Sequence, residues 1–411
     1  MNSMDVLRQE AAGFAARVVQ WGLEHIGILF RILRLCWPIP RFGHTFLVTR
    51  YDDVREVFLA DRDFPVPYKE RLDVIMGGEP FFLGMGDTVD YQRDTRAMRL
   101  AVRREDIQTR LIPSIATMAE ALVADAPGRI EIVDALTRHI AFEVMGDYFG
   151  VTAAPGADLR VWATRLFEFQ FADSGNDPSL RREVDAIAPA LRAHIDGLIA
   201  ARRQSGELKD DVLGRCLALQ REGEPGFSDA QIRSALIGFF VGGPPQLPMV
   251  VPQALEQLLR RPDVLAGAVQ AARDDNDELL ACFFFEALRF DPLGPALNRV
   301  AAHDHVVAEG TSREVCIPEG SKVLVAFSSA MMDDRRLFQP RKFKPNRQPH
   351  EYMHFGYGLH TCFGIHINKA LLPLILKPLL CRQAFRRAEG KEGHLKKRGA
   401  FSDSLWVQYD P

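Results

Sequence analysis

Cysteine is scarce in this chain, and the cysteines present follow no pairing pattern. Only six occur in 411 residues, at positions 36, 216, 282, 316, 362 and 381, and no two form a CxxC pair. A small secreted scaffold held by disulfides needs a much denser set, and a zinc ribbon needs closely spaced pairs. The pattern therefore argues against both classes. Any cysteine with a chemical role in this chain would have to act singly.

An excess of positive charge is also lacking. The net charge is −3, so nothing indicates a surface for nucleic acid. The apolar fraction of 47% and the charged fraction of 26% are ordinary for a globular protein. These values exclude a disordered chain, a collagen-like fibre and a coiled coil.

No apolar run is long and charge-free enough to predict a membrane span. The most apolar early stretch, residues 18–38, is interrupted by Glu24, His25, Arg31 and Arg34. No basic segment followed by a small-residue cleavage site appears. We predict an amphipathic segment over residues 1–40, not a transmembrane helix, and a cytoplasmic protein. A peripheral membrane contact through its aromatic and apolar side chains stays open as an alternative.

Internal repeats, low-complexity segments and flexible linkers are absent from the sequence. Helical patterns dominate, with strand signals only at residues 46–49, 299–301 and 322–326. Although the length alone would allow two or three domains, this pattern predicts one domain over residues 1–411. Its fold class is mainly α with a small β portion.

One predicted helix contains an unusual number of glycines and prolines. Ser228 and Gln231 form a capping-box start, and a largely apolar run follows. Residues 242–252 then include two glycines and four prolines. Each interior proline removes a backbone hydrogen bond, so a buried helix here must break, border a pocket or meet water or ligand. A plain loop between two helices is the alternative.

The strongest chemical signal is a glycine-rich loop around Cys362, which reads FGYGLHTCFG over residues 355–364. A following helix start would favour an anionic thiolate, and glycines allow close approach to a flat ligand. A lone thiolate suits a metal centre that takes one protein ligand, such as heme iron. Two alternatives to a heme ligand are an inert buried cysteine and, less favoured, a zinc site formed by His360, Cys362 and His366.

At this point the sequence resembles the cytochromes P-450. The loop is similar to that family's heme-binding loop, and two further family patterns precede it in the expected order. Glu286 and Arg289 are similar to the ExxR helix, and Arg347 closes a segment similar to FxPxR. A spacing of three places Glu286 and Arg289 on one helix face, where they can pair. The resemblance implies that Arg347 completes a structural triad with them.

The resemblance also implies a fold, a cofactor and a set of binding residues. The fold would be the triangular prism of cytochromes P-450, with a long central distal helix. Cys362 would be the thiolate ligand of a b-type heme (iron protoporphyrin IX), which favours O–O cleavage. Arg299 and His360 match propionate-binding positions. The other implied cofactor contacts are Phe355, Gly356, Gly364, Tyr91 and Arg93.

The chain departs from the family in the distal helix. If Gly242 and Gly243 are the family's small-residue pair, Pro245 takes the place of the usual acid and Gln246 that of the usual threonine. No Asp, Glu, Ser or Thr lies between Ala235 and Gln253. These four positions are the predicted catalytic segment, although neither Pro245 nor Gln246 is a useful proton donor.

Three functions remain in competition. The first is a monooxygenase that oxygenates a small or medium-sized hydrophobic substrate and delivers protons through water or a substrate hydroxyl. The second is a peroxygenase or a hydroperoxide isomerase or dehydratase, which starts from a reduced O–O bond. The third is a heme-binding protein without turnover. A monooxygenase would need external electron donors of the ferredoxin and ferredoxin reductase type, because no redox module is attached.

A second departure lies in the segment YQRDTR, residues 91–96. Family members commonly place a His or Trp and an Arg here on a heme propionate, whereas this chain offers Tyr91 with either Arg93 or Arg96. A solvated basic helix face is an equally good interpretation.

The aromatic-rich residues 166–171 fall where relatives have mobile helices over the substrate, which favours an apolar pocket.

Overall fold

Internal contacts divide the chain into two units. The structure, a computed structural model, describes residues 26–153, 156–207 and 209–410. Unit 1 contains residues up to 65, 294–342 and 350–353, and unit 2 contains residues 66–293, 343–349 and the chain from 354 onward. The first 25 residues of the predicted amphipathic segment lie outside the described residues.

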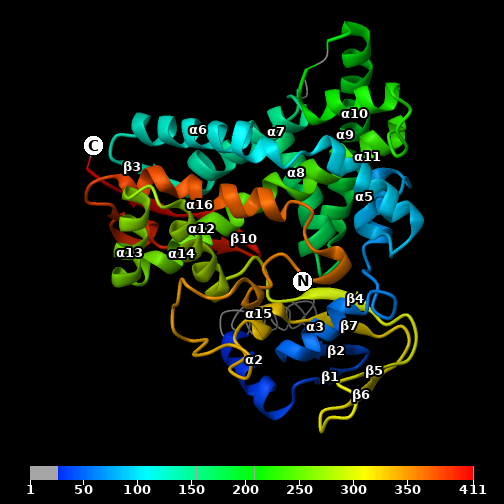
Figure 1. The fold of residues 1–411 in the computed structure, drawn as a ribbon, viewed down its shortest axis with the longest axis vertical. Helices are drawn as coiled ribbons and strands as arrows, with labels where there is room; N and C mark the ends of the chain where they lie inside the picture. Colours follow the sequence, from blue (N-terminus) through cyan, green and yellow to red (C-terminus); the bar gives the residue numbers. More distant parts are fainter. Residues whose placement is uncertain (1–25, 154–155, 208, 411) are drawn as a thin grey trace, which may run out of the picture. The chain divides into compact units, whose positions relative to one another are not determined.

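Unit 1 combines a four-stranded sheet with short helices (Figure 1). The sheet order is β1-β2-β7-β4, in which β2 and β7 run parallel and the other neighbours are antiparallel. A separate hairpin pairs β5 with β6. The elements are α2 (Ile26–Cys36), β1 (Arg41–Phe42), β2 (Thr45–Val48), α3 (Tyr51–Leu59), β4 (Leu297–Val300), β5 (His305–Val307), β6 (Val315–Ile317), β7 (Lys322–Val325) and α15 (Phe327–Ala330).

The strands predicted from sequence all form in unit 1, within one or two residues of their expected ends. β-Branched and aromatic side chains supply the register, which pairs Phe46 with Val323 and Val48 with Val325. These side chains are almost fully buried. The helix expected after the first strand is α3, and its N-terminal Tyr51 N–H donates to the Asp333 carboxylate at 3.1 Å.

Unit 2 is mainly helical (Figure 1). Its helical elements are α4 (Lys69–Met76), η1 (Phe82–Gly84), α5 (Val89–Ala101), η2 (Ile107–Leu111), α6 (Ile112–Asp125), η3 (Ile132–Arg138), α7 (His139–Phe149), α8 (Leu159–Phe167), η4 (Glu168–Ala172), α9 (Pro178–Ser205), α10 (Val212–Arg221), α11 (Asp229–Gly242), η5 (Pro244–Gln246), α12 (Leu247–Leu259), α13 (Pro262–Arg273), α14 (Asp277–Phe290), η7 (Gly358–His360), α16 (Ile365–Cys381) and η8 (Gly390–Gly393).

Short strands join parts of unit 2 that are far apart in sequence. β11 lies between β3 and β8, and β9 forms a hairpin with β10. The helix that follows the cysteine loop, α16, packs against α6, α13 and α14. The strand bounds are β3 (Arg129–Glu131), β8 (Arg386–Arg387), β9 (Lys396–Arg398), β10 (Phe401–Ser404) and β11 (Trp406–Gln408).

The glycine- and proline-rich helix begins and breaks as its sequence predicts. Ser228 and Gln231 make both hydrogen bonds of a capping box at the start of α11. The helix ends at Gly242, a single 3₁₀ turn spans Pro244–Gln246, and α12 continues from Leu247. Because proline lacks an N–H, consecutive prolines cannot continue the α-helical hydrogen-bond ladder at this point.

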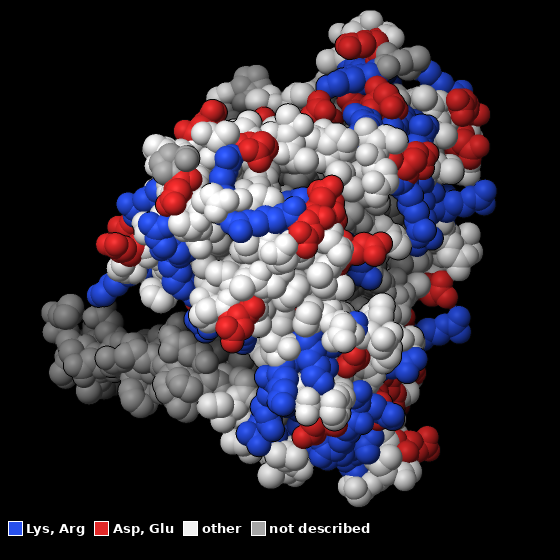
Figure 2. All heavy atoms as spheres, turned by 60° about the vertical axis from the view of Figure 1, so that its left-hand side comes forward, with Lys and Arg blue, Asp and Glu red and all other residues white. Residues whose placement is uncertain are grey.

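The α11–α12 stretch, Asp229–Leu259, is long and apolar enough to cross a membrane by length and composition alone. However, 72% of its most apolar window is buried inside the protein. This burial is typical of the central helix of a folded core. Figure 2 shows basic and acidic side chains interspersed over one face of the molecule, in keeping with the small net charge.

Candidate functional site

The loop around Cys362 is closed by its own backbone. The Cys362 N–H donates to the Phe355 carbonyl at 2.8 Å, and the Ile365 N–H donates to the Cys362 carbonyl at 3.1 Å. Gly356 and Gly358 have φ values of +71° and +74°, which a residue with a side chain adopts only under strain. Since these turns bring the cysteine directly before α16, the loop delivers Cys362 to the N-terminus of a helix.

Polar hydrogens surround the sulfur of Cys362. The Asn368 Nδ2 atom lies 4.0 Å from Sγ, and the Gly364 N–H also donates to it. Burial raises the pKa of the Cys362 thiol, whereas these two donors act in the opposite direction by stabilising the thiolate. At Gly364, an added Cβ would stand 3.9 Å from Sγ. Two N–H donors therefore face the sulfur and would stabilise a thiolate, although burial alone favours the neutral thiol.

Aromatic rings connect the loop with α11. Phe363 stacks on Phe239 with ring centroids 5.1 Å apart, and Phe82 contacts both rings at 5.5 and 6.1 Å. Phe149 also stacks on Phe239, at 5.7 Å. The structure thus brings together the cysteine loop and the predicted distal helix across an apolar layer. Phe239, three residues before the end of α11, belongs to that layer.

Tyr91 and His360, two of the predicted cofactor contacts, lie next to each other. Their rings meet edge to face at 5.9 Å, and the Tyr91 hydroxyl donates to the Leu359 carbonyl at 2.7 Å. Arg93 instead donates to Asp94 and Asp90, both at 2.7 Å. Because residues two apart on a helix point in nearly opposite directions, the structure brings Tyr91 to the cysteine loop but does not bring Arg93 there. Arg93 as a cofactor contact stays a prediction.

The predicted triad is assembled and buried. Arg289 donates to both oxygens of Glu286, at 2.9 and 2.7 Å, and Arg347 Nε donates to the same carboxylate at 3.0 Å. The Lys344 N–H adds a fourth donor at 2.9 Å. All three triad side chains are at most 2% exposed. Such a complete set of partners is what allows a carboxylate to be buried in its charged form.

Arg299 belongs to unit 1, on β4. It is 2% exposed, its guanidinium lies 5.3 Å from the centre of the Phe58 ring, and Nη1 donates to the Asn298 carbonyl at 2.9 Å. Its assignment as a propionate contact stays a prediction.

In the predicted catalytic segment, the Gln246 side chain bonds to the helix that it follows. Gln246 Nε2 donates to the Gly242 carbonyl, one of the groups that the helix break leaves without a backbone partner. Gly243 and Gln246 close the turn through backbone bonds of 2.9 and 3.1 Å. Pro245 is buried. The helix break is therefore stabilised by hydrogen bonds, and the side-chain amide of Gln246 is used in one of them.

Sequence reasoning missed several residues of the site. Asn368 sits in a helical run that looked simply apolar, so its contact with sulfur needed the three-dimensional placement. Arg104 Nη2 lies 2.8 Å from His366 Nε2. Among the described residues, His360, Cys362 and His366 do not form a cluster of metal-ligating atoms. Gln170, inside the aromatic-rich segment, is 3% exposed and lines a cavity next to α11. In the sequence, a polar residue among aromatic ones was the only sign that Gln170 could have a role in the site.

The residues present fit a heme iron by the chemistry of their donor set. One thiol stands at a helix N-terminus with N–H donors directed at it, which suits a single anionic ligand to iron. The neighbouring ring of Phe363 supplies an apolar surface. All six cysteines lie among the described residues and all are free, so Cys362 is not committed to a disulfide.

The fold and this thiol-bearing loop define a class of mainly helical heme-thiolate proteins, and comparison with known proteins agrees. The cytochrome P450 family model matches residues 163–401, more than half of the chain. The chain belongs to the cytochrome P450 family and is a heme-thiolate oxygenase.

Individual relatives resemble different extents of the chain. A vitamin D(3) 25-hydroxylase of Pseudonocardia autotrophica is 25% identical over 337 residues, which cover 80% of this chain and 77% of that protein. A bifunctional dioxygenase–epoxy alcohol synthase of Pyricularia oryzae is 31% identical over 136 residues, 33% of this chain but only 12% of that protein. The crystal structure of CalO2 superposes with a TM-score of 0.81 at 23% identity, covering 95% of this chain and 97% of CalO2, which shows the fold.

Proposed function

We propose that this enzyme oxygenates a small or medium-sized hydrophobic substrate at a b-type heme held by Cys362. The observation that carries the proposal is the sulfur at the N-terminus of α16 with the Gly364 N–H and the Asn368 amide directed at it. When bound, the heme supplies activation of an O–O bond. Tyr91 and His360 would face its periphery, and the rings of Phe239 and Phe363 would exclude water.

External donors would supply the electrons, through a basic surface at the start of α16. Arg104 contacts His366 there, and Arg99 and Lys369 act on the same histidine electrostatically. Burial and these three cations lower the pKa of His366. Such a concentration of positive charge next to the cysteine loop favours docking of an acidic ferredoxin-type protein. We place the enzyme in the cytoplasm with these donors.

The distal segment limits how protons can reach the reacting oxygen. Gln246 is bonded to the Gly242 carbonyl and Pro245 has no proton to give. A monooxygenase with this segment would take its protons from water or from a substrate hydroxyl. Similarity to a hydroxylase, the vitamin D(3) 25-hydroxylase, supports this first candidate.

The same observation supports a second candidate, an enzyme that starts from a hydroperoxide. Such a reaction begins with the O–O bond already reduced, so it does not require an acid–alcohol pair on α11. The local similarity to the bifunctional dioxygenase–epoxy alcohol synthase, over 136 residues, supports this alternative. External electron donors would then be unnecessary.

The heme ligand is tested by spectroscopy of the purified protein. We expect the reduced carbon monoxide complex to show the red-shifted Soret band of a thiolate ligand, and we expect Cys362→Ala to lose it. Cys381→Ala, at an exposed cysteine, is the matched control and should keep the band. Retention of the band in Cys362→Ala would overturn the proposal.

The oxidant is tested with one substrate under two conditions. Turnover with NAD(P)H and surrogate ferredoxin partners is compared with turnover of peroxide or the substrate hydroperoxide without reductant. Activity only with reductant supports the monooxygenase. The double variant Pro245→Glu, Gln246→Thr restores the family's usual proton donors and should then increase reductant-driven turnover. No response to this change would show that the segment does not control proton delivery.

A further inference from the structure

A small apolar cavity lies beside the C-terminal end of α11. One polar side chain, Gln170, lines it, and the space open to the centre of a water molecule is about 20 Å³. That space holds one water molecule or the polar end of a ligand. The other lining residues are Leu72, Ile75, Met76, Phe81, Leu83, Phe171, Gly238, Val241 and Gly242.

Gln170 is buried in this cavity with unused hydrogen-bonding capacity. It is 3% exposed, and neither Oε1 nor Nε2 has a hydrogen-bond partner in the structure. Burying an amide without partners is unfavourable, so natural sequences rarely keep one in an apolar environment without a reason. The amide therefore points to a ligand group that can both donate and accept.

The backbone around Gln170 is built in an uncommon way. It lies in η4, a π-helical turn in which the Asp173 N–H donates to the Glu168 carbonyl at 2.9 Å. π-Helical turns insert an extra residue into a helix and are frequent at functional sites. Here the turn directly follows α8, and the Phe171 side chain lines the same cavity.

The nearby cations are committed to other partners. The Arg71 guanidinium donates to the Phe169 and Asp173 carbonyls and to Asn176, and Arg192 donates to the Val74 and Ile75 carbonyls. No charged side chain lines the cavity. A carboxylate placed there would lack a counterion, whereas a hydroxyl could use both the donor and the acceptor of the amide.

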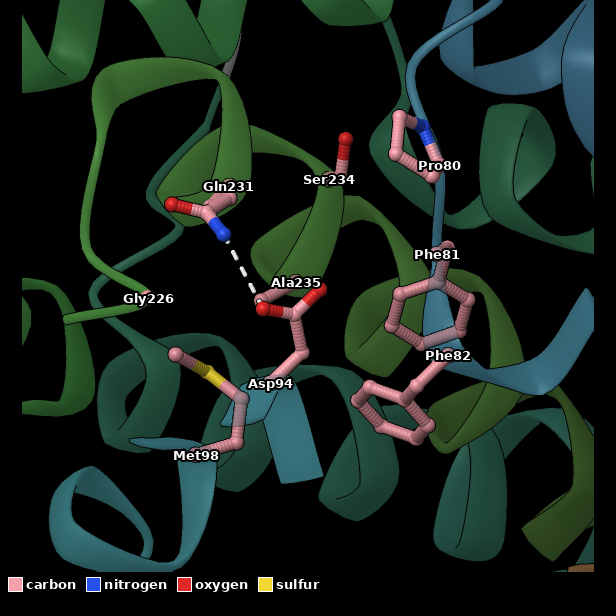
Figure 3. A pocket seen from close by; sticks show the side chains of 9 residues that line it. All are labelled: Pro80, Phe81, Phe82, Asp94, Met98, Gly226, Gln231, Ser234 and Ala235. Atoms are coloured by element: carbon pink, nitrogen blue, oxygen red, sulfur yellow. Dashed lines mark hydrogen bonds between the residues drawn. The ribbon is translucent and has the colours of Figure 1, made fainter. Parts of the chain in front are cut away.

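A neighbouring cavity shows the contrast. It is lined by Asp94, Gln231 and Ser234, and Gln231 Nε2 donates to the Asp94 carboxylate at 2.9 Å (Figure 3). The amide and the carboxylate there satisfy each other, as the dashed line in Figure 3 shows. Phe81 lines both cavities. Of these two cavities among the described residues, that of Gln170 presents an amide with both ends unused, whereas the unpartnered group of the other is the Ser234 hydroxyl.

We propose that Gln170 selects a neutral substrate that carries one hydroxyl, or a group of the same hydrogen-bonding capacity, on an otherwise apolar skeleton. This rests on the proposed oxygenase function and names its substrate class. The hydroxyl would occupy the space beside Gln170 and Gly242, and the apolar skeleton would contact the surrounding aliphatic and aromatic side chains. Fatty-acid carboxylates would be disfavoured.

A ligand-independent test compares two buried glutamines. Gln253 is 2% exposed, and with its amide suitably oriented it donates to the Met249 carbonyl at 3.2 Å and accepts from Lys397 at 2.8 Å. We expect Gln253→Met to lower the melting temperature of the holoprotein, because it removes these bonds. Gln170→Met should leave it unchanged or raise it by about 2 °C. An equal loss in both variants would overturn the proposal.

A binding test uses three probes with one skeleton: limonene, perillyl alcohol and perillate, which carry a methyl, a hydroxymethyl and a carboxylate. Calorimetric titration of the wild-type holoprotein should show perillyl alcohol binding about tenfold more tightly than the other two. Gln170→Met should abolish this preference, and Gln253→Met should keep it. A wild type without the preference, or a Gln170→Met variant that retains it, would overturn the inference.

These outcomes are separate from those of the proposed function. Calorimetry requires no turnover and no assumption about the oxidant. If the carbon monoxide complex shows the thiolate band but the alcohol preference is missing, only the assignment of Gln170 fails. If the preference is present and depends on Gln170 while the thiolate band is missing, the proposed function fails and the binding site stands.

Discussion

His354 is a partly buried imidazole at the start of the cysteine loop, and it makes the protein's stability depend on pH. Burial lowers its pKa to about 4, against the opposing effect of the hydrogen bond from Nε2 to the Phe285 carbonyl at 2.9 Å. In the unfolded chain the pKa returns to about 6.5. The unfolded state therefore takes up a proton between these two pH values while the folded state does not.

We expect this group to lower the free energy of unfolding as the pH falls from about 6.5 to about 4, by up to about 3 kcal/mol. Above pH 6.5 both states are neutral, and the full stability is present. Urea denaturation of the wild type and of His354→Gln at several pH values measures the effect. The variant keeps a donor for Phe285 but cannot be protonated, so its curve should be flatter. The exposed His394→Gln serves as the control, and identical curves for His354→Gln and the wild type would contradict the assignment.

Glu286 is a buried carboxylate that pairs with two buried arginines. Glu286→Gln preserves the shape but removes the buried negative charge that Arg289 and Arg347 both contact. We expect a loss of about 3–5 kcal/mol in the free energy of unfolding, together with poor heme retention. Urea denaturation and the heme-to-protein ratio report both effects. Glu222→Gln, at an exposed position, should change neither; comparable loss in both variants would argue against the triad.

At the scale of elements, α11 contains two glycines with opposite surroundings. A Cβ on Gly238 would lie 2.2 Å from the Phe81 ring, whereas a Cβ on Gly242 would meet nothing within 4 Å. We expect Gly238→Ala to destabilise the protein by about 1–3 kcal/mol through overpacking. Gly242→Ala should leave stability unchanged or raise it by up to about 1 kcal/mol, because alanine favours the helix.

The pair is compared by thermal and urea denaturation of the holoproteins. The two substitutions are chemically identical and lie on the same helix, so propensity alone predicts the same sign for both. If Gly238→Ala were as stable as Gly242→Ala, the Phe81 ring would not be seated against α11. Gly242→Ala also reduces the cavity that Gln170 lines, so it should weaken the binding of perillyl alcohol.

The break between α11 and α12 was predicted correctly from the sequence, but the hydrogen bonds that stabilise it were not. Two glycines followed by two consecutive prolines predict a break, and α11 does end at Gly242, whereas Pro252 is accommodated inside α12. The sequence could not say where the freed carbonyl of Gly242 finds a donor. That depends on the rotamer of Gln246 in the turn, which is a matter of three-dimensional packing.

For the molecule as a whole, sequence predicted local elements and position-specific motifs well. The loop of Cys362 and the triad of Glu286, Arg289 and Arg347 could be identified because their residue types and order are distinctive. The partners of Arg93 and the unpaired amide of Gln170 could not. Arg93 pairs with Asp94 and Asp90 on its own helix, a local choice that the sequence leaves open, and the burial of Gln170 depends on segments far apart in sequence. Glutamine in an aromatic run is ambiguous until its burial is known.

Charge near the start of α16 provides a prediction for the assembled electron-transfer system. Arg104 lies beside His366, and Arg99 and Lys369 are close enough to act on the same ring. If an acidic ferredoxin docks there, its reduction of the heme protein should slow as salt rises, since the Debye length shortens from about 10 Å at 0.1 M to about 3 Å at 1 M. Arg104→Glu should slow the reaction about tenfold at low salt and weaken its salt dependence.

Stopped-flow reduction of the heme protein by a reduced ferredoxin, at several salt concentrations, measures this effect. Arg181→Glu makes the same change of charge at an exposed arginine of α9 and should have a much smaller effect. The equilibrium carbon monoxide spectrum of Arg104→Glu should be unchanged, because the substitution alters docking and not the ligand of the iron. If the two charge reversals slowed reduction equally, net charge would be responsible, and the start of α16 would not be the docking surface.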